Sequence, residues 1–392
     1  MSAKALKIAV VAGEVSGDLL GGDLIAALKA STDRPVELVG VGGDALEAQG
    51  LHSLFDYSEL SIMGITQVLA RLPKLIRRIG QTAEAIIAAR PDVLIIIDSP
   101  DFTHRVAKKV RAALPGLPIV DYVCPSVWAW KEYRATAMLS YVDQVLAVLP
   151  FEPEVMQRLG GPKTDFVGHR LTADPEILKV RELRRQRPLK TAGEPKTILL
   201  LPGSRGAEIK ALLPVFGEAM QEFSRRNGPT RFIMPTVTRR EALVREIVSG
   251  LAIKPEIVTN QAGKWQAFGE ADAAMAASGT VILELALATV PVVSAYKTDW
   301  LITMMAKRIK TWSGALPNLI ADRVVIPEYV NEVVRPGSLC RWVEQLSVDS
   351  GPRRAMLEGY DITWDNLSVA VPPGEAAAGI VLDLLDNKKP GA

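Results

Sequence analysis

A carboxylate stands where an apolar strand ends. Asp98 follows the run Val93–Ile97, and a short continuous apolar run is typical of a strand buried on both faces of a parallel sheet. Ligands of open α/β sheets bind outside the carboxyl ends of the strands. We therefore expect Asp98 to face a substrate as a general base. Asp101 is the weaker candidate, because it equally fits a helix cap. Their DxxD spacing differs from the DxD metal clip of metal-dependent sugar transferases, and we expect no metal site.

A turn of small and acidic residues follows the first apolar run, Leu6–Ala12. Its members are Gly13, Glu14, Val15, Ser16, Gly17 and Asp18. Small residues let the backbone approach a ligand, and the N-terminus of a following helix favours anions. The turn lacks both the GxGxxG fingerprint and the GK[ST] of a phosphate-binding loop. This argues against a nicotinamide or ATP site, and a tight structural turn is the alternative to a ligand site.

Two later turns could hold a phosphate. Arg205 follows the run Ile198–Leu201, and a guanidinium pairs with phosphate through two hydrogen bonds. The second turn consists of Ser278, Gly279 and Thr280. Its amides would stand at a helix N-terminus. Glu284 follows one turn later among apolar residues, where an unpaired carboxylate would be costly; near a nucleotide it would accept hydrogen bonds from ribose hydroxyls.

One basic amphipathic segment could lie on an anionic membrane. Its apolar stripe consists of Ile65, Val68, Leu69, Leu72, Leu75 and Ile76, flanked by Arg71, Lys74, Arg77 and Arg78. Apolar and basic faces in this arrangement are typical of interfacial helices. A core helix with a solvated face has the same periodicity, and Pro73 would interrupt or kink it. Trp128 and Trp130, after the run Ile119–Val123, could stack on a sugar ring or anchor the core.

Composition excludes several classes of protein. The 392 residues carry a net charge of +2, so overall charge does not favour nucleic acid. Two cysteines, Cys124 and Cys340, and three dispersed histidines offer neither a disulfide framework nor a histidine-based metal site. The apolar window Val281–Tyr296 contains Glu284 and Pro291. It is shorter than the ~20 residues that a membrane helix needs, and we expect no signal peptide or membrane span.

Strand-like runs alternate with helical patterns in two series. This order predicts an α/β fold of two Rossmann-like, doubly wound lobes with a cleft between them. We expect a first lobe over residues 1–174, a basic linker over 175–195, a second lobe over 196–365, and a C-terminal helix within 366–392. The linker is rich in arginine, which is typical of a solvated connector. The last helix could pack on its own chain or exchange with a partner.

The motifs, in their order along the chain, resemble those of lipid-A-disaccharide synthases, glycosyltransferases with the two-lobed GT-B fold. The similarity runs from Val11 to about Glu332. The matching stretches are Gly13–Asp18, Met63-Gly64, Ile97–Phe102, Val123–Trp130, Leu149–Glu152, Gly168-His169, Leu201–Glu208, Ala277–Glu284, Leu316–Leu319 and Ile326–Glu328. Each stretch is weak alone, whereas the set is highly specific.

The resemblance implies a reaction and its participants. An inverting transfer would join UDP-2,3-diacylglucosamine to 2,3-diacylglucosamine 1-phosphate, giving a β-1,6-linked disaccharide 1-phosphate and UDP. Asp98 would be the base for the acceptor hydroxyl, and the Gly13–Asp18 turn would belong to the acceptor side. The nucleotide-sugar residues would be Arg205, Ser278, Gly279, Thr280, Glu284, Asn318 and Asn331. No cofactor or metal is implied, and no nucleic acid partner is expected.

The resemblance also implies a location and leaves alternatives open. The apolar stripe would meet acyl chains at an anionic membrane surface, on the cytoplasmic face of the inner membrane, with a homodimer as a further possibility. Three positions differ from the usual family pattern: Thr103 replaces asparagine, Arg170 proline and Asn331 glutamine. A UDP-N-acetylglucosamine epimerase would convert a soluble sugar nucleotide without an acceptor. A non-catalytic nucleotide- or lipid-binding regulator would bind UDP without turnover.

Overall fold

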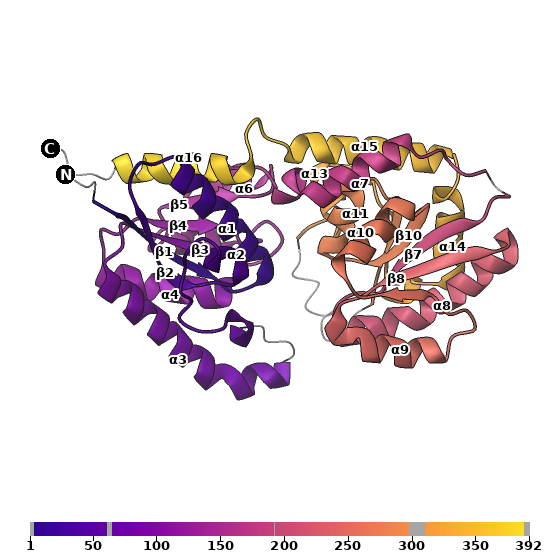
Figure 1. The fold of residues 1–392 in the computed structure, drawn as a ribbon, viewed down its shortest axis with the longest axis horizontal. Helices are drawn as coiled ribbons and strands as arrows, with labels where there is room; N and C mark the ends of the chain where they lie inside the picture. Colours follow the sequence, from indigo (N-terminus) through magenta and orange to yellow (C-terminus); the bar gives the residue numbers. More distant parts are fainter. Residues whose placement is uncertain (1–3, 61–64, 192, 298–309, 388–392) are drawn as a thin grey trace. The chain divides into compact units, whose positions relative to one another are not determined.

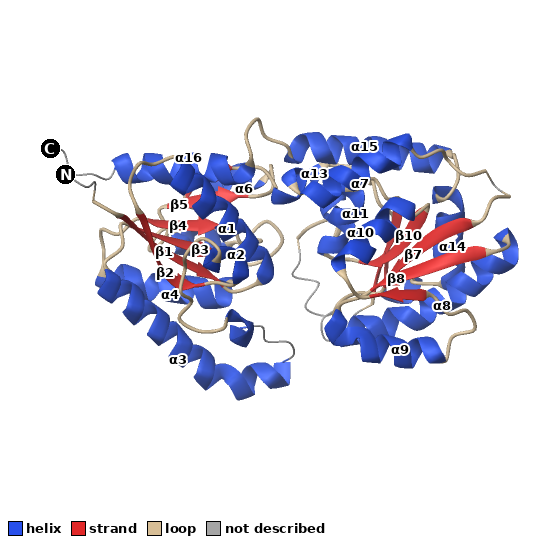
Figure 2. Ribbon diagram, in the orientation of Figure 1, coloured by secondary structure: helices blue, strands red, loops and turns tan. Residues whose placement is uncertain are grey.

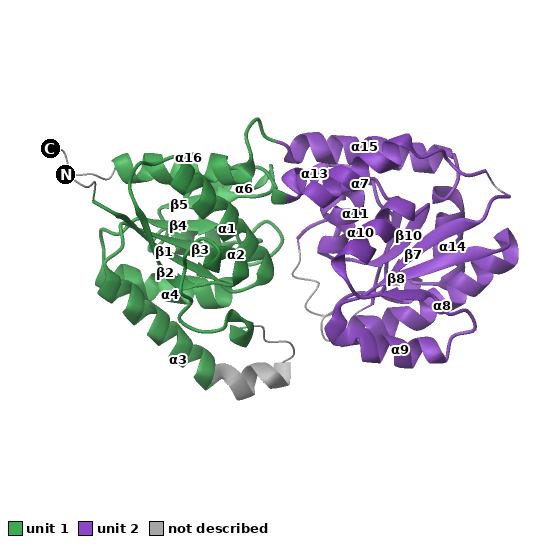
Figure 3. Ribbon diagram, viewed as in Figure 1, with its two compact units in different colours: residues 1–170, 369–392 green, residues 171–368 purple. Residues whose placement is uncertain are grey.

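A computed structural model describes residues 4–60, 65–191, 193–297 and 310–387, with the backbone alone for residues 65–72. The chain forms two compact units, shown in Figure 3. Unit 1 comprises Met1–Arg170 and Val369–Ala392, and unit 2 comprises Leu171–Ser368. Each unit is a parallel sheet with helices, as Figures 1 and 2 show. The α/β fold class with two lobes is therefore confirmed.

Unit 1 contains a parallel sheet of six strands in the order β2-β1-β3-β4-β5-β6. The strands are β1 (Leu6–Ala12), β2 (Val36–Val41), β3 (Val93–Ile97), β4 (Ile119–Tyr122), β5 (Gln144–Ala147) and β6 (Lys163–Phe166). All of β3 is buried, as its unbroken apolar run predicts. The chain adds β2 on one side of β1 and then β3 on the other side. The carboxyl ends of β1 and β3 therefore form a topological switch point.

Helices enclose this sheet. They are α1 (Val15–Ala30), α2 (Asp44–Glu47), α3 (Ile65–Ala89), α4 (Pro100–Ala113), α5 (Tyr133–Met138), α6 (Glu152–Arg158) and α16 (Pro373–Asn387), with the 3₁₀ turn η1 (Tyr57–Leu60). A second 3₁₀ turn, η2 (Arg170–Ala173), crosses the boundary between the two units. Side chains of α3 and α4, such as Ile86 and Val106, form one core with Ala9 and Leu94 of the sheet. The basic amphipathic segment forms a single helix, α3, and Pro73 does not interrupt it.

Unit 2 contains a second parallel sheet, in the order β12-β11-β10-β7-β8-β9. The strands are β7 (Lys196–Leu201), β8 (Thr230–Pro235), β9 (Glu256–Val258), β10 (Ala273–Ala277), β11 (Val292–Tyr296) and β12 (Glu328–Val330). Counted within the unit, this is the Rossmann order 3-2-1-4-5-6. Its switch point lies between the neighbouring strands β7 and β10.

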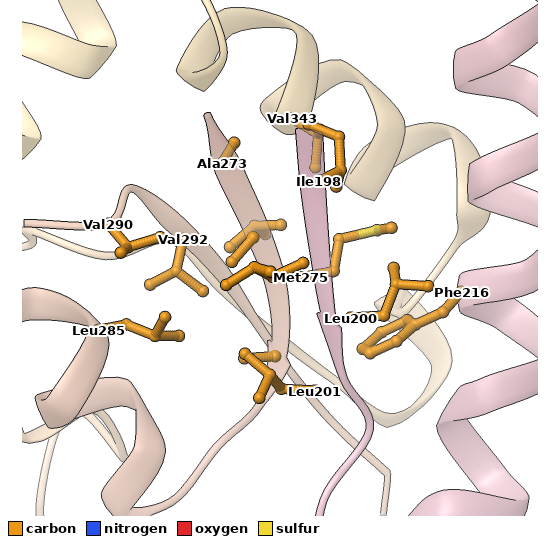
Figure 4. Close-up of a cluster of buried hydrophobic side chains, with 14 of the residues drawn as sticks. Ile198, Leu200, Leu201, Phe216, Ala273, Met275, Leu285, Val290, Val292 and Val343 are labelled. Carbon is orange, nitrogen blue, oxygen red and sulfur yellow. The ribbon is translucent and has the colours of Figure 1, made fainter. Parts of the chain in front are cut away.

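The helices of unit 2 pack around this sheet. They are α7 (Pro175–Gln186), α8 (Gly206–Asn227), α9 (Glu241–Ser249), α10 (Gln261–Glu270), α11 (Thr280–Leu287), α13 (Leu316–Ile320), α14 (Pro336–Leu346) and α15 (Gly351–Leu367), with η3 (Thr238–Arg240) and η4 (Asn331–Val333). Figure 4 shows part of the core, in which Phe216 of α8, Leu285 of α11 and Val343 of α14 gather around β7 and β10.

The described residues of the basic segment over 175–195, which was expected to be a linker, are part of unit 2. Several of their arginines bind within that unit, while many of the side chains between them are exposed. Arg184 of α7 donates to the carbonyls of Phe268 (3.1 Å) and Thr289 (3.1 Å), and Arg187 pairs with Asp272 at 2.7 Å. These arginines therefore attach α7 to unit 2 through carbonyls and a carboxylate that lie far along the chain.

The C-terminal helix α16 packs against α1 of its own chain. Ala377, Ala378 and Val381 are buried in this contact region of unit 1. A Cβ at Gly374 would lie 2.9 Å from the carbonyl oxygen of Asp23, so the close approach requires glycine. The first unit thus ends at Arg170 and is completed by the tail. Packing on its own chain is one of the two arrangements expected for this helix, and exchange with a partner chain is the other.

Candidate active site

A cavity of about 720 Å³ opens at the carboxyl edge of the unit 2 sheet. It is lined by the segments that follow β7, β8, β9 and β10, and so surrounds the switch point. Arg205, Ser278, Gly279, Thr280 and Glu284 all line it. The structure therefore brings together five of the residues predicted to bind a nucleotide sugar. Such a crevice is where doubly wound folds bind their ligands.

The turn after β7 holds Arg205 in place. Gly203 has a φ of +108°, and a Cβ there would lie 2.4 Å from Glu208 Oε2. Glu208 accepts hydrogen bonds from the Arg205 backbone N–H at 3.3 Å and from Arg205 Nη1 at 3.1 Å. The Arg205 side chain stays 67% exposed. A guanidinium oriented in this way at the edge of a cavity can bind an anionic group.

The turn between β10 and α11 presents backbone amides. Ser278 N–H donates to Ala295 O at 3.0 Å, and Ser278 Oγ lies 3.4 Å from Gly314 O. Gly279 is the N-cap of α11 and, like Thr280, is exposed. The first amides of a helix lack intrahelical partners. This end of the cavity therefore favours negative charge.

Glu284 pairs with a lysine, so its carboxylate is not an isolated charge. Lys264 Nζ lies 2.7 Å from Glu284 Oε2, and each side chain is 20% exposed. Both residues line the cavity. Lys264 belongs to α10, and no motif in the sequence distinguishes it. Thr236 and Asn260 are further lining residues that sequence reasoning missed.

Asn318 is committed to contacts within its own unit. It is 1% exposed and is not a lining residue of the cavity. Its Oδ1 accepts from the backbone N–H groups of Val325 and Ile326, each at 2.8 Å, while its Nδ2 donates to Ile326 O at 3.0 Å. The side chain fixes the segment before β12. The structure therefore does not place Asn318 at the cavity predicted to bind the nucleotide.

Asn331 lies beyond the cavity described above. It follows β12 directly, is half-buried, and has a φ of +54°. Asparagine tolerates this left-handed conformation better than most residues. It is not among the lining residues. Its part in nucleotide binding remains a prediction.

Asp98 stands at the switch point of the unit 1 sheet, directly after β3. Asp98 and Ser99 have φ values of +52° and +46°, a left-handed pair without glycine. Asp98 Oδ1 accepts from Ser99 N–H at 2.7 Å, and Oδ2 lies 3.3 Å from Ser16 Oγ. Left-handed conformations of such residues cluster at functional sites. The structure thus brings Ser16 of the first turn to the predicted base.

Contacts to the backbone of Asp98 and Ser99 fix their conformation. Thr103 is fully buried, and its Oγ1 lies 2.7 Å from Asp98 O and 3.2 Å from Ser99 O. Asp98 N–H donates to Tyr122 O of the neighbouring strand at 3.1 Å. A Cβ at Gly13 would lie 2.6 Å from Ser99 Oγ, so this glycine permits the turn. These contacts fix the backbone from which the Asp98 carboxylate projects.

The rest of the first turn divides between exposed and structural residues. Glu14 and Ser16 are exposed, whereas Asp18 is 3% exposed. Asp18 Oδ1 accepts from Gly43 N–H at 2.7 Å and Oδ2 from Ala45 N–H at 2.9 Å, which caps α2. A Cβ at Gly17 would lie 3.3 Å from Ile97 O, so α1 approaches β3 closely there. Asp18 and Gly17 therefore shape the turn.

The two tryptophans that follow β4 differ in their surroundings. Trp128 Nε1–H donates to Glu152 Oε1 at 3.2 Å, and burial raises the pKa of Glu152 to about 8. Trp130 is 38% exposed, and Lys131 Nζ lies 4.0 Å from its ring centre. Trp128 is thus an anchor, and Trp130 faces solvent.

Asp101, the weaker candidate for the base, has a side chain that is 87% exposed and lies 3.8 Å from Arg134.

The apolar stripe of α3 is described only in part. The side chains of Ile65, Val68, Leu69 and Leu72 lie outside the described residues. Leu75 packs against the unit 1 core, whereas Ile76 is 54% exposed. Lys74 and Arg78 both pair with Glu59, at 3.2 and 2.8 Å. Part of the expected basic face is therefore neutralised within the chain.

Comparison with known proteins extends over nearly the whole chain. The profile of the lipid-A-disaccharide synthetase family matches residues 8–341. The chain is 46% identical over 388 residues to the lipid-A-disaccharide synthase of Nitrobacter winogradskyi, covering 98% of this chain and 96% of that protein. The corresponding enzyme of Ruegeria pomeroyi is 40% identical over 392 residues, covering 97% of this chain and 96% of that one.

Solved structures share the fold at low identity. MnaA of S. aureus, in a co-structure with UDP, has a TM-score of 0.62 at 13% identity and covers 96% of this chain and 95% of its own. MurG of Acinetobacter baumannii has a TM-score of 0.55 at 14% identity, covering 97% and 99%. Similarity at this level establishes the architecture of the two units.

Proposed function

The chain belongs to the lipid-A-disaccharide synthetase family, and we propose that it is an inverting glycosyltransferase. It joins UDP-2,3-diacylglucosamine to 2,3-diacylglucosamine 1-phosphate and releases UDP. The observation that carries this proposal is the unit 2 cavity, which gathers Arg205, the α11 N-terminus and Glu284 at a Rossmann switch point. A nucleoside diphosphate presents two features that such a lining matches: an anionic diphosphate and a ribose diol.

Each feature of the nucleotide has its own partners in the proposal. Arg205 and the exposed first amides of α11 bind the diphosphate, and Glu284 accepts hydrogen bonds from the ribose hydroxyls. The same donors stabilise the negative charge that develops on UDP as it leaves. MnaA of S. aureus, which shares the fold, is recorded in a co-structure with UDP. Because Arg205 and the α11 amides supply the positive potential, the proposed transfer needs no metal ion.

Asp98 is the general base in the proposed reaction. The donor carries UDP on an α-anomeric carbon and the product linkage is β, so one in-line displacement inverts the centre. Such a displacement needs one carboxylate to accept the proton of the acceptor 6-hydroxyl, and no second nucleophilic carboxylate. Ser16 borders Asp98 at 3.3 Å, and Ser16 and Glu14 are exposed members of the turn that we assign to the acceptor side.

We place the protein at the surface of the inner membrane, on its cytoplasmic face. Ile76 supports this because it is an exposed apolar side chain on the amphipathic helix α3. The stripe that begins at Ile65 would contact acyl chains of donor and acceptor at an anionic surface. Among the residues described, no helix is both long and apolar enough to span a bilayer. A homodimer belongs to the same proposal, and sedimentation of the purified chain tests it.

The test is UDP release from UDP-2,3-diacylglucosamine in EDTA and mild detergent, with and without the acceptor. We expect acceptor-dependent UDP release and a β-linked disaccharide 1-phosphate. Conversion of UDP-N-acetylglucosamine without an acceptor would refute the transferase and favour an epimerase. UDP binding without turnover of either donor would favour the regulator.

A further inference from the structure

Lys264 is a cavity residue that the proposed function does not use. It lies on α10, and its Nζ is 2.7 Å from Glu284 Oε2 on α11. Both side chains line the cavity and retain 20% exposure. No other partner of the Glu284 carboxylate is found among the described residues. The pair thus links two helices that follow different strands at the edge of the same cavity.

Aromatic rings limit where the Lys264 ammonium can lie. Its Nζ lies 4.5 Å from the ring centre of Trp265 and 5.4 Å from that of Phe268. Phe268 is fully buried, and Trp265 packs against the same core. A cation near two aromatic rings is attracted to their faces. Lys264 therefore differs from a flexible surface lysine, because the rings and Glu284 together define its position.

We propose that Lys264 is a positioning residue that holds Glu284 for the ribose of the nucleotide. This inference rests on the proposed function. The ammonium occupies Oε2 of Glu284 and leaves Oε1 to accept hydrogen bonds from the ribose hydroxyls.

A purely structural ion pair is the alternative role for Lys264. A partly exposed pair contributes little to folding, so stability alone cannot distinguish the two roles. Nucleotide analogues can. If Lys264 acts through Glu284, its loss weakens only ligands that carry the ribose diol. If Lys264 acts as a general positive charge, its loss weakens every diphosphate equally.

The experiment compares Lys264→Met with wild type by calorimetric titration with UDP and with 2′,3′-dideoxy-UDP. Methionine keeps the apolar stem and removes the charge. We expect the Kd for UDP to rise about 10- to 100-fold, the range for losing hydrogen bonds to a charged group. The Kd for the dideoxy analogue should change less than about 3-fold, within the scatter of such measurements.

Two controls isolate the interaction. Lys210→Met removes an exposed lysine of α8 that does not line the cavity, and it should leave both Kd values unchanged. In a Glu284→Gln background, Lys264→Met should have little further effect on UDP binding, because the two residues act as one unit. Lys264→Gln is the second variant, should the methionine variant fail to fold in a thermal unfolding check.

The outcomes separate the inference from the function on which it rests. Equal losses for UDP and the dideoxy analogue, or unchanged UDP binding in folded Lys264→Met, overturn the positioning role alone. Failure of the wild-type chain to bind UDP overturns the proposed function together with this inference. A loss confined to UDP, and absent from the Glu284→Gln background, supports both.

Discussion

Replacing Thr103 with valine tests how the fold holds the predicted base. The substitution keeps the shape of a fully buried side chain and removes the Oγ1 hydroxyl that lies 2.7 Å from Asp98 O. Leaving a buried acceptor without its donor costs about 1–3 kcal/mol. Asp98 and Ser99 both have left-handed φ values, and this conformation costs roughly 1–2 kcal/mol per residue. The hydroxyl therefore helps to offset strain beneath the base.

We expect Thr103→Val to lower the free energy of unfolding by about 1–3 kcal/mol, as measured in urea. Turnover should fall about 10- to 100-fold, since misplacement of a reacting group by about 1 Å costs on the order of 100-fold. UDP release in the presence of acceptor measures this, and UDP affinity should be unchanged. Thr103→Ser keeps the hydroxyl and should retain turnover. A valine variant that is less stable yet fully active would refute the reasoning.

Two further predictions concern other buried polar groups. Asn318→Ala removes the acceptor of the buried Val325 and Ile326 amides. Because each unsatisfied amide costs about 1–3 kcal/mol, thermal unfolding should show a lower free energy of unfolding, while the folded variant still binds UDP. Unaltered stability would contradict this. Glu152 has its pKa raised from 4.5 to about 8 in the folded chain. Between about pH 4.5 and 8 the Glu152 carboxyl therefore binds fewer protons in the unfolded chain than in the folded chain. Its contribution to the free energy of unfolding is complete below about pH 4.5 and is lost as the pH rises to about 8. Glu152→Gln should remove that slope in urea titrations, and a slope equal to wild type would contradict the assignment.

The interior strands were predictable because their apolar runs are unbroken. Expected strands at Leu6–Ala12 and Val93–Ile97 match the interior strands β1 and β3 residue for residue. The strands β6 (Lys163–Phe166) and β12 (Glu328–Val330) were missed. Both lie at the edges of their sheets and carry charged residues. An edge strand buries less surface, so its sequence lacks the apolar signal.

Polar contacts between distant segments could not be predicted from local pattern. Lys264 meets Glu284 only because α10 and α11 lie at the same sheet edge, 20 residues apart along the chain. Arg184 belongs to a charged run that is typical of a solvated connector, yet its partners are the carbonyls of Phe268 and Thr289. Asn318 lies in a family motif, but its contacts show that it fixes the fold. Sequence pattern thus found the turns and missed which side chains support them.

We propose that Asp98 is the base of a transfer for which unit 2 binds UDP. The most direct test compares wild type with Asp98→Ala for turnover of both acyl substrates and for UDP affinity. We expect turnover to fall about 100- to 10,000-fold, the contribution of general base catalysis, with UDP affinity unchanged. Near-normal turnover in Asp98→Ala would contradict it and move the search for the base to Asp101 or Glu14.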